Sequence, residues 1–445
     1  MAADLLTIAS SGARAAKAAL DVTANNISNA SSEGYVRRSV TVTELGVNSV
    51  STSPTEINLA GVRVASVVRN ADTFRQSEVR RTGSDAARAD AEVQGLENIE
   101  SAVEQTGAYD SIVNFEAALQ QLVSDPSDGA LRASVVEQGR SMAETFNVTS
   151  SSLQAVGDGL RFEAQSGVDT VNSITTELAR VNLRLARSSD SSSDQTSLLD
   201  QRDLLLQNLS DQLGISTSFG TNGVVTVTLG DSSGPTMVTG GTASTLEMAT
   251  ATDGTISFTL DSSAATIDSG ALAGKGQALT QLADTNSQLD ALAAKIIDTV
   301  NTAQANGVDL NGDTGTALFS GTGAADMTMI ATGGSAVATA AAGSAAGSRD
   351  ATNLTALRDA LSTADPAGDM NTVLFGISSA VAGRTVTRDA LDSIASAAKV
   401  ALQAQAGVDL DQEAVNLVRY QQAFQASGRV MQVASDIFDT ILGIK

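Results

Sequence analysis

The residue types that most enzymes use for acid–base, nucleophilic and metal chemistry are poorly represented in this sequence. It has 445 residues but no histidine and no cysteine. This excludes Ser–His–Asp and Cys–His nucleophilic sites, histidine-based zinc sites, thiolate clusters and disulfides. Carboxylates are plentiful, but nothing in the sequence marks a pair held together in a pocket, so glycosidase-type chemistry has no support. We therefore expect no catalytic residues and no enzymatic activity.

Two short segments resemble ligand-binding loops only in part. Residues 309–313 (DLNGD) combine acidic side chains with glycine, as a calcium loop does. However, the glycine is fourth instead of sixth, and Ser320 occupies the twelfth position, where such a loop needs Glu. A polar turn is the better interpretation. Residues 274–276 (GKG) lack the flanking spacing of a phosphate loop and indicate the approach to a helix. We expect neither a metal nor a cofactor.

The charge balance limits the possible partners. There are 27 Lys and Arg residues against 50 Asp and Glu, which gives a net charge of −23. Nucleic acids and anionic membrane surfaces attract cationic proteins, so both are poor partners for this chain. No apolar run is long enough to span a membrane, and we expect no membrane insertion. The first twenty residues lack the compact apolar block of a cleaved secretion signal. The protein is expected to be cytosolic or to leave the cell without signal cleavage.

Both ends of the chain show helical heptad patterns. The N-terminal pattern has mainly small residues at 3–4 spacing: Leu5, Ile8, Gly12, Ala15, Ala19, Val22 and Asn26. The C-terminal pattern has large residues seven apart: Leu417, Phe424, Met431 and Phe438. Small residues allow helices to approach closely but bury little area. We expect the two terminal helices to lie side by side, to be loose in the monomer and to fold when packed against other subunits.

The segments between the termini alternate between helical and β patterns. Two short strands are predicted near 35–45 and 58–69, joined by a loop containing Pro54, and a β-rich segment at 215–267. Helices are predicted from about Ser84, at 110–122, through 139–185, at 197–213, 272–306, 354–361, 371–405 and 410–442. A continuous helix over 139–185 would be about 70 Å long. Residues 307–348 are of low complexity, either further β turns or a flexible surface segment.

These patterns predict a mainly α fold with a β insertion. The N- and C-terminal segments form a long antiparallel helical bundle or coiled coil, and the middle of the chain forms a small β-rich domain. Three domains are expected: a terminal helical coiled coil (1–34 plus 406–445), an elongated helical domain with a short β-hairpin (35–213 plus 271–405), and a small β-rich domain (214–270, possibly with 307–350).

Three stretches of sequence resemble a known family. Residues 24–30 (ANNISNA), followed by Gly34 and Tyr35, are similar to the N-terminal signature of bacterial flagellar axial proteins. Residues 198–203 (LLDQRD) and 408–414 (VDLDQEA), the latter running on to 417–426 (LVRYQQAFQA), resemble the hook-associated members of that family. The chain departs from the family pattern at 31–33 (SSE), where Asn-Thr-Pro is usual, and at Phe424, where Tyr is common.

The resemblance implies a structural adaptor at the junction between flagellar hook and filament, located in the extracellular flagellum. It implies export through the flagellar type III apparatus and self-association into a ring or helical array. The implied partners are the hook protein, a second junction protein on the filament side and an export chaperone. The expected inner assembly surface comprises Leu5, Ile8, Val22, Asn25, Asn26, Ile27, Asn29, Leu417, Tyr420, Phe424, Met431 and Phe438. The chaperone would bind Leu417, Phe424, Met431 and Phe438.

Two other functions remain open. The chain could be another axial component, from hook or rod; absence of the 198–203 segment would favour this, and the segment is present. It could also be a coiled-coil signalling or scaffold protein of the chemoreceptor type, which has similar Ala- and Ser-rich heptads. Such proteins usually need a membrane anchor and lack a β insertion between helical arms.

Overall fold

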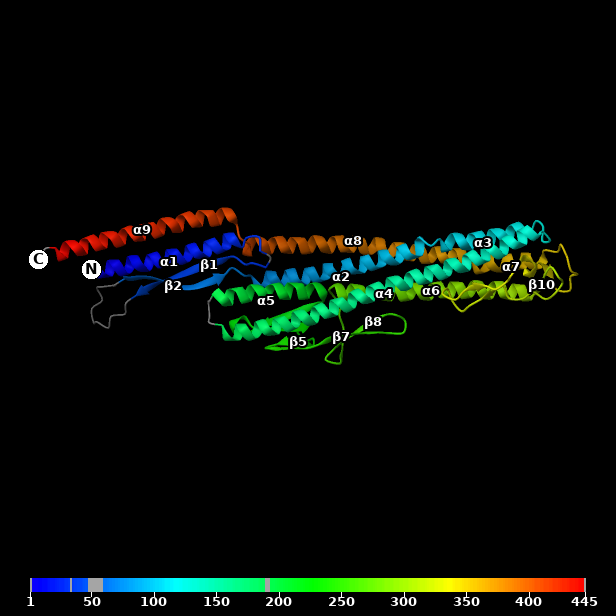
Figure 1. The fold of residues 1–445 in the computed structure, drawn as a ribbon, viewed down its shortest axis with the longest axis horizontal. Helices are drawn as coiled ribbons and strands as arrows, with labels where there is room; N and C mark the ends of the chain where they lie inside the picture. Colours follow the sequence, from blue (N-terminus) through cyan, green and yellow to red (C-terminus); the bar gives the residue numbers. More distant parts are fainter. Residues whose placement is uncertain (1, 33, 47–58, 189–192, 444–445) are drawn as a thin grey trace. The chain divides into compact units, whose positions relative to one another are not determined.

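A computed structural model describes residues 2–32, 34–46, 59–188 and 193–443 of the chain, and it is mainly helical, as predicted (Figure 1). The loop predicted around Pro54 lies outside these residues. The helices are α1 (Ala2–Ser28), α2 (Thr73–Glu104), α3 (Ala108–Leu122), α4 (Gly129–Arg187), α5 (Ser193–Gln212), α6 (Ala271–Ala305), α7 (Thr352–Ala364), α8 (Pro366–Ala406) and α9 (Leu410–Leu442).

The strands are short and form small antiparallel sheets. They are β1 (Arg38–Gly46), β2 (Leu59–Arg69), β3 (Ile215–Phe219), β4 (Val225–Leu229), β5 (Thr236–Thr239), β6 (Thr242–Ala243), β7 (Leu246–Thr250), β8 (Ile256–Leu260), β9 (Ser263–Ala265), β10 (Gly307–Val308), β11 (Phe319–Ser320), β12 (Thr328–Met329) and β13 (Ala340–Ala341). Sheet orders are β1-β2, β3-β4-β5-β6, β7-β8-β9, β10-β13 and β11-β12.

The chain divides into two compact units. The first unit comprises Met1–Asp85, Thr170–Thr245 and Asp392–Lys445, and the second comprises Ala86–Asp169 and Leu246–Leu391. The four-stranded sheet that begins with β3 belongs to the first unit, and the three-stranded sheet that begins with β7 belongs to the second. The partition into three domains expected from the sequence stays a prediction.

In the first unit, α1 and α9 lie side by side and run antiparallel, as the terminal heptads predict. Figure 1 shows both chain ends at the same end of this helix pair. A Cβ atom on Gly12 would lie 3.1 Å from Ser427 Oγ. Asn26 Nδ2 donates to Glu413 Oε2 at 3.2 Å. The interval from Gly12 to Asn26 equals that from Glu413 to Ser427, so one heptad register relates the two helices along this length.

The β1–β2 hairpin packs on α1 through an unusually close backbone approach. The Val62 N–H donates to Ser11 Oγ at 3.0 Å, and Ser11 Oγ donates to Ile8 O at 2.7 Å. Gly61 has φ +95°, and a Cβ there would lie 2.2 Å from Ser11 Oγ. Only glycine combines this left-handed conformation with the absence of a side chain. Gly61 therefore fixes how closely the hairpin approaches the terminal helix.

Helix α2 begins earlier than the sequence predicted. The apolar pattern indicated a start near Ser84, whereas the helix starts at Thr73. Asp72 Oδ1 accepts hydrogen bonds from the N–H groups of Phe74 and Arg75, which caps the helix. The first turns are largely polar, and Phe74 is 76% exposed, so they carry little apolar periodicity. The prediction was wrong because the buried side of these turns is largely polar, with Gln76, Arg80 and Thr82 among its residues, and therefore leaves no apolar stripe in the sequence.

The second unit has a continuous apolar core contributed by α2, α3, α4, α6, α7 and α8. Its aromatic centre is an edge-to-face contact of Phe115 with Phe319, with ring centroids 5.7 Å apart. Helix α4 contains the whole predicted 139–185 stretch and extends it at both ends. Asp128 caps it, since its Oδ1 accepts from the N–H groups of Ala130 and Leu131 at 2.8 Å.

The low-complexity segment 307–348 is held by buried side chains from neighbouring helices. Arg132 on α4 is 1% exposed, and it donates to Val337 O at 2.7 Å and to Thr339 Oγ1 at 2.7 Å. Within the segment, Asp309 Oδ1 accepts from the N–H groups of Asn311 and Asp313. The predicted polar turn therefore uses its carboxylate to close the turn itself.

Candidate functional site

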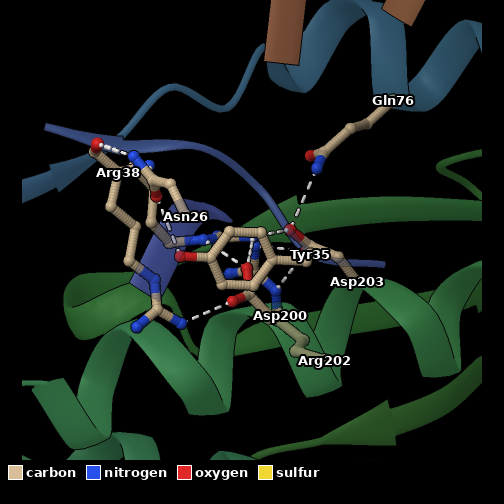
Figure 2. A network of polar contacts seen from close by, with 8 residues as sticks. Asn26, Tyr35, Arg38, Gln76, Asp200, Arg202 and Asp203 are labelled. Carbon is tan, nitrogen blue, oxygen red and sulfur yellow. Dashed lines mark hydrogen bonds and ion pairs between the residues drawn. The ribbon is translucent and has the colours of Figure 1, made fainter. Parts of the chain in front are cut away.

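The three stretches that carry the family resemblance meet at one place in the first unit, although they are far apart in sequence. Their side chains join residues of the hairpin and of α2 in a polar network, part of which is shown in Figure 2. We use this name for Asn26, Tyr35, Arg37, Arg38, Arg69, Gln76, Asp200, Arg202, Asp203 and Glu413. Figure 2 shows Gln76 pointing from α2 toward Asp203 on α5.

Asn26 lies near the C-terminal end of α1. Its side-chain amide pairs with the backbone of Arg38 in the way that a neighbouring strand would. Its Nδ2 donates to Arg38 O at 2.9 Å, and its Oδ1 accepts from Arg38 N at 3.0 Å. Tyr35 Oη also donates to Asn26 Oδ1, at 2.9 Å. With the bond to Glu413, both donors and both acceptor positions of the amide are used. Asn26 is 1% exposed, so its hydrogen bonds replace those that water would otherwise supply.

Glu413 links the first turn of α9 to the N-terminal segment. Its Oε1 accepts from Arg37 Nε at 2.8 Å, while its Oε2 accepts from Asn26. The Glu413 side chain is 1% exposed and that of Arg37 is 27% exposed. The partly exposed guanidinium of Arg37 therefore neutralises the buried carboxylate of Glu413. Asp409 caps α9 by accepting from the N–H groups of Asp411 and Gln412. The acidic first turn also suits the positive end of the helix dipole.

Asp200 lies between two arginines that would otherwise repel each other. Arg38 and Arg69 are directly opposite on β1 and β2. Like charges in this cross-strand position are destabilising. Arg38 Nη2 is 2.7 Å from Asp200 Oδ2, and Arg69 Nη2 is 2.7 Å from Asp200 Oδ1. The carboxylate of α5 therefore both neutralises the pair and attaches the hairpin to the helix.

Asp203 is a second buried carboxylate of the network, with a side chain that is 8% exposed. It accepts from Arg202 Nε at 2.9 Å, from Arg69 Nη2 at 2.8 Å and from Gln76 Nε2 at 3.0 Å. Burial by itself raises the pKa of Asp203, but the Arg202 and Arg69 guanidinium groups together hold that pKa below its usual value. The carboxylate is thus kept ionised by its partners and has no free lone pair for acid–base chemistry.

The arginines around Asp203 are themselves fixed by neutral groups. Arg202 Nη1 donates to Gly223 O at 2.6 Å, and its guanidinium lies 4.5 Å from the centroid of the Phe219 ring. Arg80 Nη2 donates to Thr217 Oγ1 at 3.2 Å. Burial lowers the pKa of both Arg80 and Arg202, and Asp203 partly offsets this. Strand β3 and the turn that follows it are therefore connected to α5 and α2 through cations.

The surroundings of the network support packing better than catalysis. A cleft of about 1000 Å³ opens beside it, lined by α2, α5, α8 and the segment after α1. The carboxylate of Asp203 reaches this cleft but is held by arginines, as described above. Among the described residues, no three His, Cys, Asp or Glu side chains are grouped to hold a metal ion. The same described residues include no helix long and apolar enough to cross a membrane.

The residues predicted from sequence to form the inner surface have different environments. Asn26 is buried; Leu5, Asn25, Phe424 and Phe438 are exposed; and Ile8, Val22, Ile27, Asn29, Leu417, Tyr420 and Met431 are half-buried. The structure brings Asn26 into the polar network and places the others on α1 and α9, except Asn29, which lies in the turn after α1. The assignment of all of them to one assembly surface stays a prediction.

Sequence reasoning missed two features of this region. The first is the set of partners Arg37, Arg38 and Arg69, whose positive charges lie near the ends of the predicted strands and are the sequence signal of a carboxylate-binding role. The second is a stripe on α9 outside the predicted heptads, which is apolar except for Gln422. Its members follow 3–4 spacing and are all exposed: Val415, Val418, Gln422, Ala426, Val430, Val433 and Ile437. We call this set the outer stripe; its helical spacing is visible in the sequence, but its exposure is not.

Replacing Asn26 with Asp should destabilise the first unit although side-chain size is unchanged. The substitution removes both N–H donors and places a carboxylate against Arg38 O and Glu413. We expect a loss of about 2 kcal/mol in unfolding free energy, measured by urea titration. Asn25→Asp is the matched control, because Asn25 is exposed and donates only within α1, to Asp21 O. Equal stability of the two variants would contradict this role for Asn26.

Comparison with known proteins connects this geometry to one family. The model of the flagellar hook-associated protein FlgK helical domain matches residues 93–319, just over half of the chain. Residues 6–35 match flagella basal body rod protein, and residues 403–444 match the flagellar basal body rod FlgEFG protein C-terminal model. Each of the three matches contributes residues to the polar network. The two end matches are shared with rod proteins, whereas the central one is specific to the hook-associated type.

Three proteins illustrate the similarity. Flagellar hook-associated protein 1 of Bacillus subtilis is 25% identical, over 96% of this chain and 95% of the relative. The Escherichia coli protein of the same name is 26% identical over 71% of this chain, and this chain spans only 59% of that relative's length. The flagellar hook junction protein FlgK from Burkholderia pseudomallei has a solved structure that is 23% identical, with a TM-score of 0.49 over 55% of this chain and 46% of that one.

Proposed function

The chain belongs to the FlgK family of flagellar hook-associated proteins, and from this we propose that its α1–α9 pair is the surface through which it joins hook to filament. The protein is a structural component of the hook–filament junction in the extracellular flagellum. As an axial component, it assembles with other axial proteins. Its mechanism is packing, since the ionised groups of the polar network bind one another.

The observation that carries the proposal is the exposed apolar area on this helix pair. Large apolar residues of the outer stripe are 41–63% exposed, from Ile437 to Val415. On the α1 side, Leu5 is 44% exposed and Leu6 is 46% exposed. A helix with apolar residues on opposite sides requires cover on both. Helix α1 covers one side of α9, so a neighbouring subunit is the natural cover for the other.

The polar network supports the same proposal, because it holds α1 and α9 in place without covering their exposed apolar residues. Small residues along α1, such as Ala15 and Ala19, bury little area when they pack against α9. The buried bonds of Asn26 and Glu413 attach both helices to the hairpin and α5 instead. This arrangement leaves apolar area unused in the single chain while keeping the two helices in place. Looseness of the termini before assembly stays a prediction.

We further propose the individual partners that the sequence suggested. The hook protein would contact one end of a ring or helical array of this subunit, and a second junction protein would contact the filament side. Head-to-tail contacts that do not close on themselves generate such arrays. An export chaperone would cover α9 before assembly, using Phe424 and Phe438, which are 43% and 52% exposed, together with Leu417 and Met431. Export would use the flagellar type III apparatus.

The assembly role can be tested by placing charges on the outer stripe. Val415→Asp combined with Val433→Asp changes two exposed residues, each expected to alter unfolding free energy by no more than about 0.5 kcal/mol. We expect the double variant to melt like the parent protein but to lose attachment to purified hooks, viewed by electron microscopy. Carboxylates on the stripe would have to be desolvated in the interface, which is costly.

The matched control is Phe162→Asp, an apolar-to-acidic change at a side chain 76% exposed on α4 in the second unit. This variant should attach to hooks as the parent does. Normal hook attachment by the Val415→Asp, Val433→Asp protein would exclude the outer stripe from the junction. Equal loss in both proteins would show that added negative charge, and not the position of the stripe, disrupts assembly.

A further inference from the structure

We infer that Asn26, Arg37 and Glu413, which we call the clasp, select one heptad register for the α1–α9 pair. The clasp thereby sets the level along the pair at which the exposed apolar residues of the two helices lie. The choice of register is a property of the single chain and can be measured without assembly. Only the use of those exposed residues in assembly rests on the function proposed above.

The apolar part of the α1–α9 contact does not specify a register. On α1 the facing residues recur every seven positions as Leu5, Gly12, Ala19 and Asn26. On α9 the corresponding series is Glu413, Tyr420, Ser427 and Ala434. The contacts of Gly12 with Ser427 and of Asn26 with Glu413 fix the observed alignment. Sliding α9 by one heptad again sets small residues against small or half-buried ones, so apolar burial discriminates poorly between registers.

The clasp is not repeated along the helices, so it does discriminate. In the observed register the Glu413 carboxylate accepts from Asn26 at 3.2 Å and from Arg37 at 2.8 Å, and it is 1% exposed. After a one-heptad shift, that carboxylate would lose its bond from Asn26, whose position would face Tyr420 or the residues before α9. A buried charge that loses its partners is strongly unfavourable. Fixing register is also the best-attested role of single buried polar groups in helix pairs.

The register determines the level along the pair at which the exposed apolar residues of the two helices lie. The spacing that relates Gly12 to Ser427 places Leu6 level with Val433 and Leu5 level with Ala434. Leu6 and Val433 are 46% and 57% exposed, so the observed register sets exposed apolar residues of α1 and of the outer stripe at one level. A one-heptad shift would move them about 10 Å apart along the pair. A subunit with the wrong register would present these residues to its neighbours at mismatched levels.

The connection between α8 and α9 is the competing explanation for the register. The Arg37 N–H donates to Ala406 O at 3.0 Å, and Asn70 Nδ2 donates to Gln405 O at 2.6 Å, so the end of α8 is held near the hairpin. Only the short segment 407–409 separates it from α9. If this tether fixed the alignment, removal of the clasp would leave the register unchanged. The two explanations therefore make opposite predictions for a variant without Glu413.

Because the natural chain contains no cysteine, disulfide trapping can read the register directly. The in-register pair is Gly12→Cys with Ser427→Cys, where the 3.1 Å from the Gly12 Cβ position to Ser427 Oγ suits a disulfide. The displaced pairs are Gly12→Cys with Tyr420→Cys and Gly12→Cys with Ala434→Cys. Each pair is introduced into the full chain, alone and with Glu413→Leu, and oxidised under identical conditions.

In the parent background we expect only the in-register pair to form a disulfide. With Glu413→Leu we expect a displaced pair to become cross-linked and the in-register yield to fall at least about twofold, as for registers of nearly equal energy. Glu413→Gln should restore the parent pattern, because its amide oxygen can still accept from Asn26. Thr23→Val, which changes a buried polar residue of α1 outside the clasp, should also keep the parent pattern.

Two results would overturn the inference. An unchanged preference for the in-register pair in Glu413→Leu would assign the register to the tether. Loss of every cross-link would mean that the clasp holds the helices together and does not choose among alignments. Neither result would bear on the outer stripe, whose test is attachment to hooks, so failure of the register inference and failure of the assembly proposal are distinguishable.

Discussion

Asp203→Ala should lower the unfolding free energy of the first unit by about 3–5 kcal/mol, the range expected when one partner of a buried ion pair is removed. The substitution leaves Arg202, which is 5% exposed, without its carboxylate and removes one of two carboxylates from Arg69. Burial and, to a smaller extent, the like charge of Arg202 lower the pKa of Arg80, while Asp203 opposes both, so without Asp203 the remaining cations would repel one another. Urea unfolding followed by circular dichroism measures the loss.

The control for this prediction is Asp158→Ala, which removes a carboxylate from an ion pair with Arg161 whose Asp158 side chain is 67% exposed. Exposed pairs of this kind contribute about 0–1 kcal/mol. If Asp203→Ala lowered the unfolding free energy no more than Asp158→Ala, the buried ion pairs of the network would contribute no more to stability than an exposed ion pair does. Asp203→Asn provides a second measurement, because it keeps the volume and one acceptor oxygen but removes the charge.

The effect of Asp203 should also depend on pH in a defined direction. Because its folded pKa lies below the usual value of 3.8, Asp203 contributes stability that is present above about pH 4 and is lost as the pH falls through the folded pKa. The difference in unfolding free energy between the parent and Asp203→Ala should therefore be constant near neutral pH and narrow on acidification. A difference that widened below pH 4 would contradict the assigned direction of the pKa shift.

Arg132→Ala should destabilise the second unit by a similar amount, about 3–5 kcal/mol. Arg132 donates to Pro126 O at 2.5 Å, to Val337 O at 2.7 Å and to Thr339 Oγ1 at 2.7 Å. Removing the side chain leaves these acceptors without donors and opens a cavity at a fully buried position. Burial lowers the pKa of Arg132, and the charge of Asp309 partly offsets this. Its hydrogen bonds go to carbonyl oxygens and to the Thr339 hydroxyl, so the cost comes from these groups and from packing.

The measurement for Arg132→Ala should separate local from global effects. Hydrogen exchange of the full chain should show faster exchange across 334–341, the segment held by Arg132, than elsewhere in the second unit. Arg140→Ala is the control on the same helix, since Arg140 is paired with Glu137 three residues earlier at the surface. Unchanged protection of 334–341 in Arg132→Ala would mean that the low-complexity segment is ordered by its own turns.

The polar network also shows why part of the site could be anticipated and part could not. The Asn-rich end of the first helix, the 198–203 segment and the start of the last helix were recognisable because each is a short, local pattern. Their meeting was not predictable from spacing. Asn26 and Glu413 are separated by almost the whole chain, and their bond depends on the alignment of two helices whose apolar seams repeat every seven residues.

The sequence by itself determined the helical character, the antiparallel terminal pair, the continuous long helix and the family, because periodicity and short motifs are local properties. It also excluded histidine and cysteine chemistry through composition alone. Only the tertiary structure decided that Asp200 neutralises two facing arginines, that α2 begins at Thr73 and that α9 carries an exposed outer stripe. Those features depend on which side chains packing brings within hydrogen-bonding distance and which it leaves uncovered, and neither is encoded by spacing along one segment.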